Sequence, residues 1–273
     1  MQESVVLAVV IGILQGIFEW LPISSEGNIT LFLNLVANIE PAVAIQLSLF
    51  LHAGTALSAL AYYREEVAAL VRTLPSWRPE RAFDRERSEL TFLVVATFMT
   101  GIVGIPSLVL LEQFVSELAG GVFVALIGGL LIVTGIIQRG VEERGGRRDT
   151  PDLVDAVLVG GLQGLAVLPG ISRSGTTASA LLLRGHDGPS SFQLSFLLSI
   201  PAAIGGGLLP LLDGGIPAIS PSMAAIALAT SAVVGYLTID ALMRVVERVA
   251  FWGVCVGLGS LAVLGGVLVY VAF

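Results

Sequence analysis

Residues 169–177, Pro-Gly-Ile-Ser-Arg-Ser-Gly-Thr-Thr, combine a guanidinium with several hydroxyl groups in a mostly apolar chain. Arg173 lies between the apolar runs 153–168 and 178–183. A cation there is costly in lipid and is functional by default. Its planar fork suits two phosphate oxygens, although a buried ion pair with Glu19 is the alternative. We expect it to bind phosphate, and the neighbouring hydroxyl and backbone N–H groups either to donate to the same anion or to cap a helix from 176. These neighbours are Ser172, Ser174, Thr176, Thr177, Gly170 and Gly175.

A second polar stretch, residues 15–28, places an amide and a carboxylate on one face of a predicted helix. Gln15 and Glu19 are four positions apart and therefore neighbours on that face. Their oxygens suit a hard divalent cation, Mg²⁺ or Ca²⁺, with water and phosphate completing the shell. The alternative is a packing amide beside a carboxylate at the membrane boundary. We expect the metal here, because an anion-binding turn elsewhere in the chain would complete the site.

Ser24 and Ser25 follow Pro22, which interrupts the helix. A serine at such a turn either caps the next helix or acts as a nucleophile. A nucleophile needs a base or a metal to take its proton, and Glu19, Glu26 or a bound cation are the candidates.

The composition is that of an integral membrane protein. Of 273 residues 55% are hydrophobic and 13% charged, and the mean hydropathy is +0.91, whereas soluble domains carry about 25% charged residues. All fourteen basic residues are arginine and the net charge is −7, which argues against a nucleic-acid partner. The apolar runs are continuous rather than alternating, which favours helices over a barrel.

An internal repeat divides the chain. Leu14–Gly16 recurs as Leu162–Gly164, 148 positions later, and Gln46–Ser48 recurs as Gln193–Ser195, 147 positions later. We therefore predict one all-α membrane domain of two repeats. The first is 1–145, with a re-entrant hairpin at 4–38 and spans at 42–63, 90–111 and 118–138; the second is 146–273, with a hairpin at 153–184 and spans at 191–212, 222–243 and 250–272.

The distribution of arginine favours this topology over four full spans in each half. With hairpins, the loops 64–89, 139–152, 184–190 and 244–249 share one side and hold thirteen of the fourteen arginines. This side is then cytoplasmic. With three spans in each half, the two repeats have opposite orientations in the membrane, as in many transporters. The tips of the two hairpins can then meet at the midplane. Both termini are expected outside the plasma membrane.

These residues resemble the undecaprenyl-diphosphate phosphatase family of the bacitracin-resistance type. Its Glu/Gln-x-x-x-Glu motif fits Gln15 and Glu19, and the following Leu-Pro-x-Ser-Ser-x-Gly is matched from Leu21 to Gly27. Its Pro-Gly-x-Ser-Arg-Ser-Gly signature is matched in full at 169–175. The resemblance covers nearly the whole chain and includes the segment order.

The resemblance implies a membrane hydrolase that removes the terminal phosphate from a polyprenyl diphosphate of undecaprenyl or dolichyl type. It implies a divalent cation, inverted repeats with re-entrant hairpins and a site open to the outer face. Glu19 would bind metal or move protons, Ser25 would be the nucleophile and Arg173 the phosphate clamp. The partners implied are the lipid diphosphate and the bilayer; a homodimer is left open.

One departure from the family pattern bears on catalysis. Asn28 stands where the family has histidine, and Glu26 precedes the motif glycine. If that histidine is the acid or base, Glu26 or water must replace it here. His52 lies in a predicted span and is expected to be a hydrogen-bonded core residue, with a role in the site left open. The alternatives to the hydrolase are a lipid-phosphate flippase using the same anion site and a catalytically inactive binding homologue.

Overall fold

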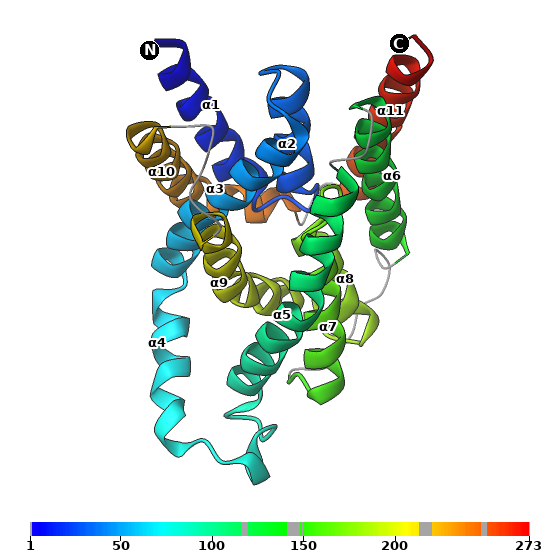
Figure 1. Ribbon diagram of the computed structural model, residues 1–273. Helices are drawn as coiled ribbons and strands as arrows, with labels where there is room; N and C mark the ends of the chain where they lie inside the picture. Colours follow the sequence, from blue (N-terminus) through cyan, green and yellow to red (C-terminus); the bar gives the residue numbers. More distant parts are fainter. Residues whose placement is uncertain are drawn as a thin grey trace.

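The computed structural model describes residues 2–115, 120–140, 148, 150–212, 220–246 and 250–272, and these fold into helices joined by turns (Figure 1). The long helices are α3 (Pro41–Tyr62), α5 (Ser88–Val115), α6 (Gly120–Arg139), α9 (Gly188–Leu212), α10 (Pro221–Val246) and α11 (Phe251–Ala272). The shorter ones are α1 (Gln2–Phe18), α2 (Ser25–Leu35), α4 (Arg64–Thr73), α7 (Leu153–Leu165) and α8 (Arg173–Leu183), with 3₁₀ turns η1 (Leu74–Ser76) and η2 (Pro79–Arg81).

Six of the described helices are long and apolar enough to cross a membrane, and they are the six predicted spans. Their bounds differ from the prediction by a few residues, as is usual for helix ends. The prediction treated 64–89 as a polar loop, but it contains α4 and both 3₁₀ turns. The predicted spans and loops that include 116–119, 141–147, 213–219 or 247–249 fall partly outside the described residues.

Two pairs of short helices, α1 with α2 and α7 with α8, are each joined by a turn within the bundle. Ser24 caps α2, because its hydroxyl accepts the Gly27 N–H at 3.2 Å. The expectation that the second short helix of the other pair begins at 176 is wrong. It begins at Arg173, because the Ser172 hydroxyl accepts the Gly175 N–H at 3.1 Å and caps it there.

Four helices of the first half of the bundle have their main packing partner in the second half. α1 packs on α10 and α7 packs on α5, while α3 pairs with α9 and α6 with α11. Glycines allow the backbones to approach closely: a Cβ at Gly16 would lie 2.8 Å from the Gly235 nitrogen, and one at Gly164 would lie 2.8 Å from the Gly104 nitrogen. Such small-residue contacts are typical of membrane helices.

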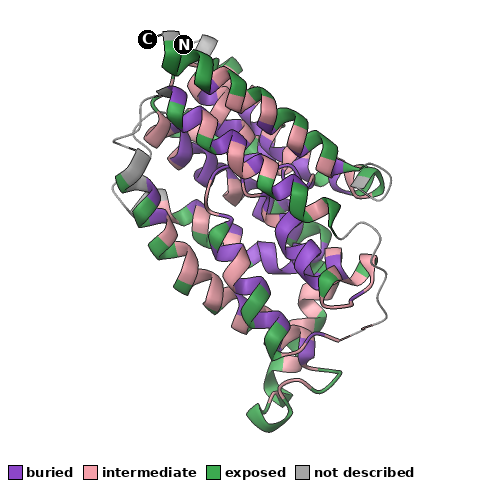
Figure 2. Ribbon diagram, turned by 90° about the vertical axis from the view of Figure 1, so that its right-hand side faces the viewer, coloured by how far each residue is buried: buried purple, intermediate pink, exposed green. Residues whose placement is uncertain are grey.

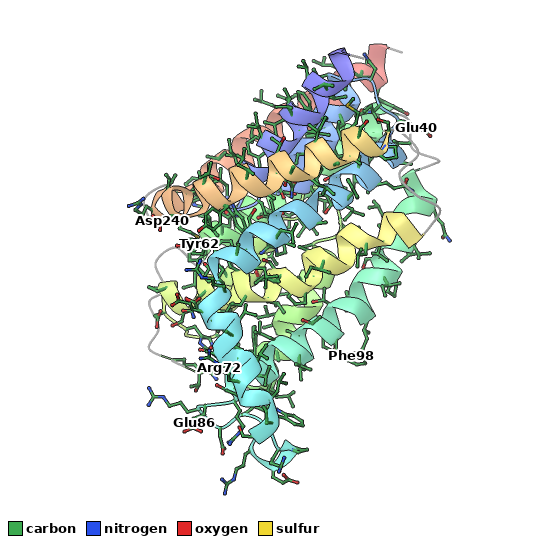
Figure 3. The ribbon with its side chains drawn as sticks, turned by 90° about the vertical axis from the view of Figure 1, so that its left-hand side faces the viewer. Glu40, Tyr62, Arg72, Glu86, Phe98 and Asp240 are labelled. Carbon is green, nitrogen blue, oxygen red and sulfur yellow. The ribbon has the colours of Figure 1, made fainter. Side chains whose placement is uncertain are left out.

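The bundle has a buried, polar centre, and charged residues lie at both of its ends. Figure 2 shows the buried positions on the inner faces of the helices, and these include Gln15, Glu19 and Glu26. The first residues of α1 and the last of α11 lie at one end (Figure 1), the end that also carries Glu40, whereas Arg72 and Glu86 lie at the opposite end (Figure 3). Polar groups buried among apolar spans must find partners, and the turns between the short helices supply them.

Candidate active site

The turn between α1 and α2 contacts the turn between α7 and α8 inside the bundle. The Ser24 hydroxyl accepts a second hydrogen bond, from the Gly170 N–H across the contact at 3.1 Å. A Cβ at Gly27 would lie 2.6 Å from the Gly170 nitrogen, so the contact requires glycine there. Ser24 has a φ of 60°, which is uncommon for a residue with a side chain. Ser24 therefore joins the turns and caps α2, one of the two roles that the sequence left open.

Glu19 is the centre of the polar cluster. One carboxylate oxygen forms an ion pair with Arg173. The other accepts hydrogen bonds from the Ser25 hydroxyl at 2.8 Å and the Gln15 amide at 3.1 Å. The Glu19 side chain is only 3% exposed, so its charge depends on these partners. A hydroxyl within hydrogen-bond distance of a buried carboxylate is the geometry that a nucleophile with its base requires.

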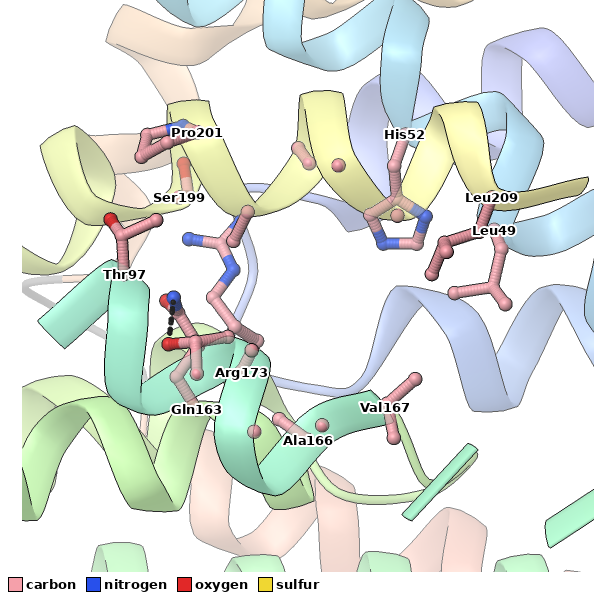
Figure 4. A pocket seen from close by; sticks show the side chains of 18 of the residues that line it. Leu49, His52, Thr97, Gln163, Ala166, Val167, Arg173, Ser199, Pro201 and Leu209 are labelled. Carbon is pink, nitrogen blue, oxygen red and sulfur yellow. Dashed lines mark hydrogen bonds between the residues drawn. The ribbon is translucent and has the colours of Figure 1, made fainter. Parts of the chain in front are cut away.

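The Arg173 guanidinium lies between the Glu19 carboxylate and a cavity. Its guanidinium also approaches the Ser195 carbonyl at 3.5 Å and lies 6.0 Å from the centre of the Phe196 ring. In Figure 4 the guanidinium has Gln163 on one side and His52 on the other, and it lines a cavity. The ion pair with Glu19 that the sequence offered for Arg173 is present, and the guanidinium also lines the cavity, where phosphate binding stays a prediction.

His52 also belongs to the cluster. Its Nδ1 lies 2.9 Å from the Ser48 carbonyl, so Nδ1 carries a proton. Its Nε2 lies 3.4 Å from the Glu19 oxygen that accepts from Ser25. The expected core hydrogen bond is present, and the structure in addition brings the ring into the site.

Asn28 does not take the place of a proton-transfer group. Its side-chain amide donates to the Ile23 carbonyl at 2.7 Å and the Ser24 carbonyl at 2.9 Å. An amide with these two acceptors holds the turn in shape.

A small pocket collects most of the predicted site residues. Its lining includes Glu19, Ser24, Ser25, Glu26, His52, Ser172, Arg173 and Ser174. Gln15 contacts Glu19 from outside this lining, and Thr176 is buried elsewhere with its hydroxyl unpartnered. The N–H groups of Gly170 and Gly175 are already donated to Ser24 and Ser172, so in this arrangement both glycines shape the turns.

The comparisons identify the family. The profile of the family described as bacitracin resistance protein BacA matches residues 8–261. The chain belongs to this family. An undecaprenyl-diphosphatase of Haloarcula marismortui is 54% identical over 268 residues, covering 98% of this chain and 99% of the relative. Undecaprenyl-diphosphatases of Methanococcoides burtonii and Methanopyrus kandleri are 42% and 41% identical, each covering 94% of this chain and 96% and 94% of the relatives.

The structure adds site residues that the motifs of the BacA family did not indicate. On α6, the Thr134 hydroxyl donates to the Gly170 carbonyl at 3.1 Å and accepts the Ser172 N–H at 3.2 Å, while Gln138 donates to the Pro22 carbonyl. The signal that could have indicated Thr134 and Gln138 from the sequence is a polar residue within an apolar span. Ser48 and Ser195, which contact His52 and Arg173 through their carbonyls, were signalled by the repeat.

The expected divalent cation fits the site only together with substrate. Gln15 donates its amide N–H to Glu19 and has its oxygen buried without a hydrogen-bond partner, and Arg173 already faces that carboxylate. Within the described residues no group of three or more His, Cys, Asp or Glu side chains could hold a metal. Glu26, however, has a buried oxygen without a hydrogen-bond partner in the same pocket. Mg²⁺ is commonly held by one or two carboxylates plus substrate phosphates, which this donor set can provide.

Proposed function

We propose that this chain hydrolyses a polyprenyl diphosphate, of undecaprenyl or dolichyl type, to the monophosphate and inorganic phosphate. The observation that carries the proposal is the contact of Ser25 with Glu19 beside the Arg173 guanidinium. The names of the full-length relatives support the same reaction. They favour a hydrolase over a flippase or an inactive homologue. The product would return a lipid carrier to envelope or glycan synthesis.

The proposed mechanism follows from these contacts. The Ser25 oxygen attacks the terminal phosphorus while its proton passes to Glu19, 2.8 Å away. The bond from that phosphorus to the bridging oxygen breaks, and the lipid monophosphate leaves with the bond's electron pair. Water then attacks the phosphoserine, the bond from phosphorus to the Ser25 oxygen breaks, the proton on Glu19 returns to that oxygen, and inorganic phosphate leaves with the protons of the water. The alternative is direct attack by water, with Ser25 as a ligand. In both, Arg173 neutralises the charge on the phosphoryl oxygens.

The divalent cation, Mg²⁺ or Ca²⁺, would be held by Glu19 and Glu26 with the substrate's phosphate, and would supply further positive charge at the phosphoryl oxygens. Gln15 would orient Glu19 through the 3.1 Å hydrogen bond. The Ser172 and Ser174 hydroxyls, which line the same pocket, would donate to the anion.

We also propose that the two halves are inverted repeats, with α1–α2 and α7–α8 as re-entrant hairpins, so that the site opens to the outer face of the plasma membrane. The helix packing supports this, because the first helix of each hairpin packs on the middle span of the other half of the chain. The six arginines of 64–89 support the orientation, because this segment lies at the end opposite the termini (Figure 1).

The test measures the phosphate that the purified protein, in nanodiscs, releases from an undecaprenyl diphosphate. The assay is run with Mg²⁺, with Ca²⁺ and with a chelator. We expect release with a divalent cation, and a loss of about 100-fold or more in Arg173→Lys, because lysine lacks the bidentate fork. Arg139→Lys is the control, because its guanidinium stacks on Trp252 and lines neither the small pocket nor the cavity. Absence of release under all three conditions, in protein that still binds the lipid, would exclude the hydrolase and favour a transporter or binding homologue.

A further inference from the structure

The segment that joins the spans α3 and α5 carries a helix, α4, that the proposed reaction does not use. The first of these spans ends at Tyr62 and the next begins at Ser88, so both ends of the segment lie at the same boundary of the apolar bundle. In Figure 3, where Arg72 marks α4, the helix runs across the direction of α9 and α10. It therefore follows this boundary, whereas a continuation of α3 in its own direction would leave the bundle.

One side of α4 is an apolar stripe, and the bundle covers only part of it. Val67, Leu70, Val71 and Leu74 follow the spacing i, i+3, i+4 and i+7, which places them along one side of a helix. Val67 and Leu70 pack on the buried cluster around Phe196, which α9 and α10 share. Val71 and Leu74 are 54% and 51% exposed. Because the stripe is continuous, its exposed part faces the same way as its packed part, toward the level of the spans.

Aromatic residues place both ends of α4 at the depth of the membrane boundary. Tyr62 ends the span α3, and its ring packs edge-on against Tyr63 just before α4. Trp77, beyond the other end of α4, donates its Nε1–H to the Thr91 hydroxyl of α5 at 3.1 Å. Thr91 lies about one helical turn before Val94, which is 59% exposed on the surface of that span. Tyrosine and tryptophan are enriched at this depth, where apolar and wet layers meet.

The side of α4 opposite the stripe is exposed and polar. Glu65, Ala69 and Arg72 lie there, and Arg64 forms an exposed ion pair with Glu65 at 3.7 Å. A helix with these two sides lies in the membrane interface, with its apolar side about 5–10 Å into the boundary between headgroups and acyl chains. Arginine suits such a helix, because its stem can lie along apolar surface while its charge stays at the headgroups or in water.

We propose that α4 is an interfacial helix that binds the lipid surface, with Val71 and Leu74 inserted into one leaflet and the charged side toward water. The partner of the exposed stripe is then the bilayer itself. The leaflet is the cytoplasmic one in the orientation proposed above, but the insertion does not depend on that orientation or on the proposed reaction. Lipid would thus hold in place the connection between α3, which carries His52, and α5.

The experiment measures the depth of single labels on the full-length protein in nanodiscs. Leu74→Cys, Ala69→Cys and Phe98→Cys are each labelled with a fluorescent maleimide. Ala69→Cys is the matched control, because Ala69 is exposed on the opposite side of the same helix. Phe98, 68% exposed on the span α5, reports contact with acyl chains, and the native Cys255 is buried. The quenchers are phosphatidylcholine brominated near its headgroup and iodide in the water.

We expect brominated lipid to lower the emission of labelled Leu74→Cys about twofold, as for Phe98→Cys, and to affect Ala69→Cys little, because the apolar side lies about 5–10 Å into the leaflet. Iodide should show the reverse order. Val71→Cys, the second position on the exposed stripe, should behave as Leu74→Cys. Equal quenching of Leu74→Cys and Ala69→Cys by iodide, without an effect of brominated lipid, would overturn the proposal. Protection of Leu74→Cys from both quenchers would overturn it too, because a second copy or a partner protein would then cover the stripe.

Discussion

At the scale of single residues, adjacent serines have different partners. Ser25 donates to Glu19 at 2.8 Å, whereas the Ser24 hydroxyl accepts N–H groups from both turns. If Ser25 is the nucleophile, Ser25→Ala should lower kcat by about 10²- to 10⁴-fold, the scale of lost proton-transfer catalysis, with little change in KM. Steady-state phosphate release measures this.

Ser24→Ala is the matched control. It should cost roughly 0.5–2 kcal/mol of stability, as lost caps do, and raise KM more than it lowers kcat. Retention of most of the wild-type kcat by Ser25→Ala would remove the nucleophile role and leave attack by water.

His52 gives a second prediction at this scale, because its Nε2 faces Glu19 at 3.4 Å. His52→Gln keeps a polar side chain beside that carboxylate and should lower kcat/KM by less than about 10-fold. His52→Leu leaves the carboxylate without this partner. A buried polar group that loses a partner costs about 1–3 kcal/mol, so roughly a 5- to 150-fold loss in kcat/KM is expected. Equal activity of the two variants in the same assay would show that His52 only fills space.

At the scale of elements, α6 fixes the turn before α8. Thr134 exchanges hydrogen bonds with Gly170 and Ser172, both at the start of the anion-binding stretch. Thr134→Val keeps the shape but leaves a buried N–H and a buried carbonyl without these partners, at about 1–3 kcal/mol each. We expect a lower unfolding temperature and a higher KM. The control is Thr238→Val on α10, because the Thr238 hydroxyl contacts only carbonyls. A larger change in unfolding temperature and KM in Thr238→Val than in Thr134→Val would contradict the role of α6.

The ion pairs at the start of α7 join three segments. Asp152 caps α7 and pairs with Arg148 at 2.7 Å and Arg184 at 2.9 Å. Burial acts to raise the pKa of Asp152, but the Asp155 N–H and Arg148 outweigh it and hold the pKa below its usual value. The stabilisation is therefore present above the unfolded pKa of about 4 and is lost as pH falls below it.

Asp152→Asn keeps a cap and loses the charge. We expect a lower unfolding temperature than wild type at pH 7 and a smaller difference near pH 3, in the same detergent. A difference independent of pH would show that the ion pairs do not stabilise the fold.

The sequence predicted the elements well because spans are long apolar runs, and it predicted the two turns because their motifs are polar interruptions of those runs. It did not predict the contacts across the bundle. Thr134 and Gln138 carry no motif, and their function depends on which carbonyl each one faces. Gly170 was expected to donate its N–H to phosphate and Gly27 was only a motif match, whereas the structure shows one glycine packed on the other.

At the scale of the whole molecule, the same helix contact occurs twice. Gly12 and Gly16 pack on α10, and Gly160 and Gly164, each 148 positions later, pack on α5. A pseudo-two-fold axis in the membrane plane would relate these contacts and bring a short helix pair to the centre from each side. The signature motifs would then lie on opposite hairpins. Each half supplies one part of the site, Glu19 and Ser25 from the first and Arg173 from the second, so neither half alone would bind and cleave a diphosphate.

The proposed orientation predicts which surface groups are outside the cell. Glu40 and Glu86 are both exposed and lie at opposite ends of the molecule (Figure 3). The one native cysteine, Cys255, is buried, so background labelling is low. With a membrane-impermeant maleimide, Glu40→Cys should label in intact cells, and Glu86→Cys only after permeabilisation. The arginine-rich segment around Glu86 belongs on the cytoplasmic side by the positive-inside rule. Labelling of Glu86→Cys and not Glu40→Cys in intact cells would reverse the orientation and place the site's opening on the cytoplasmic face.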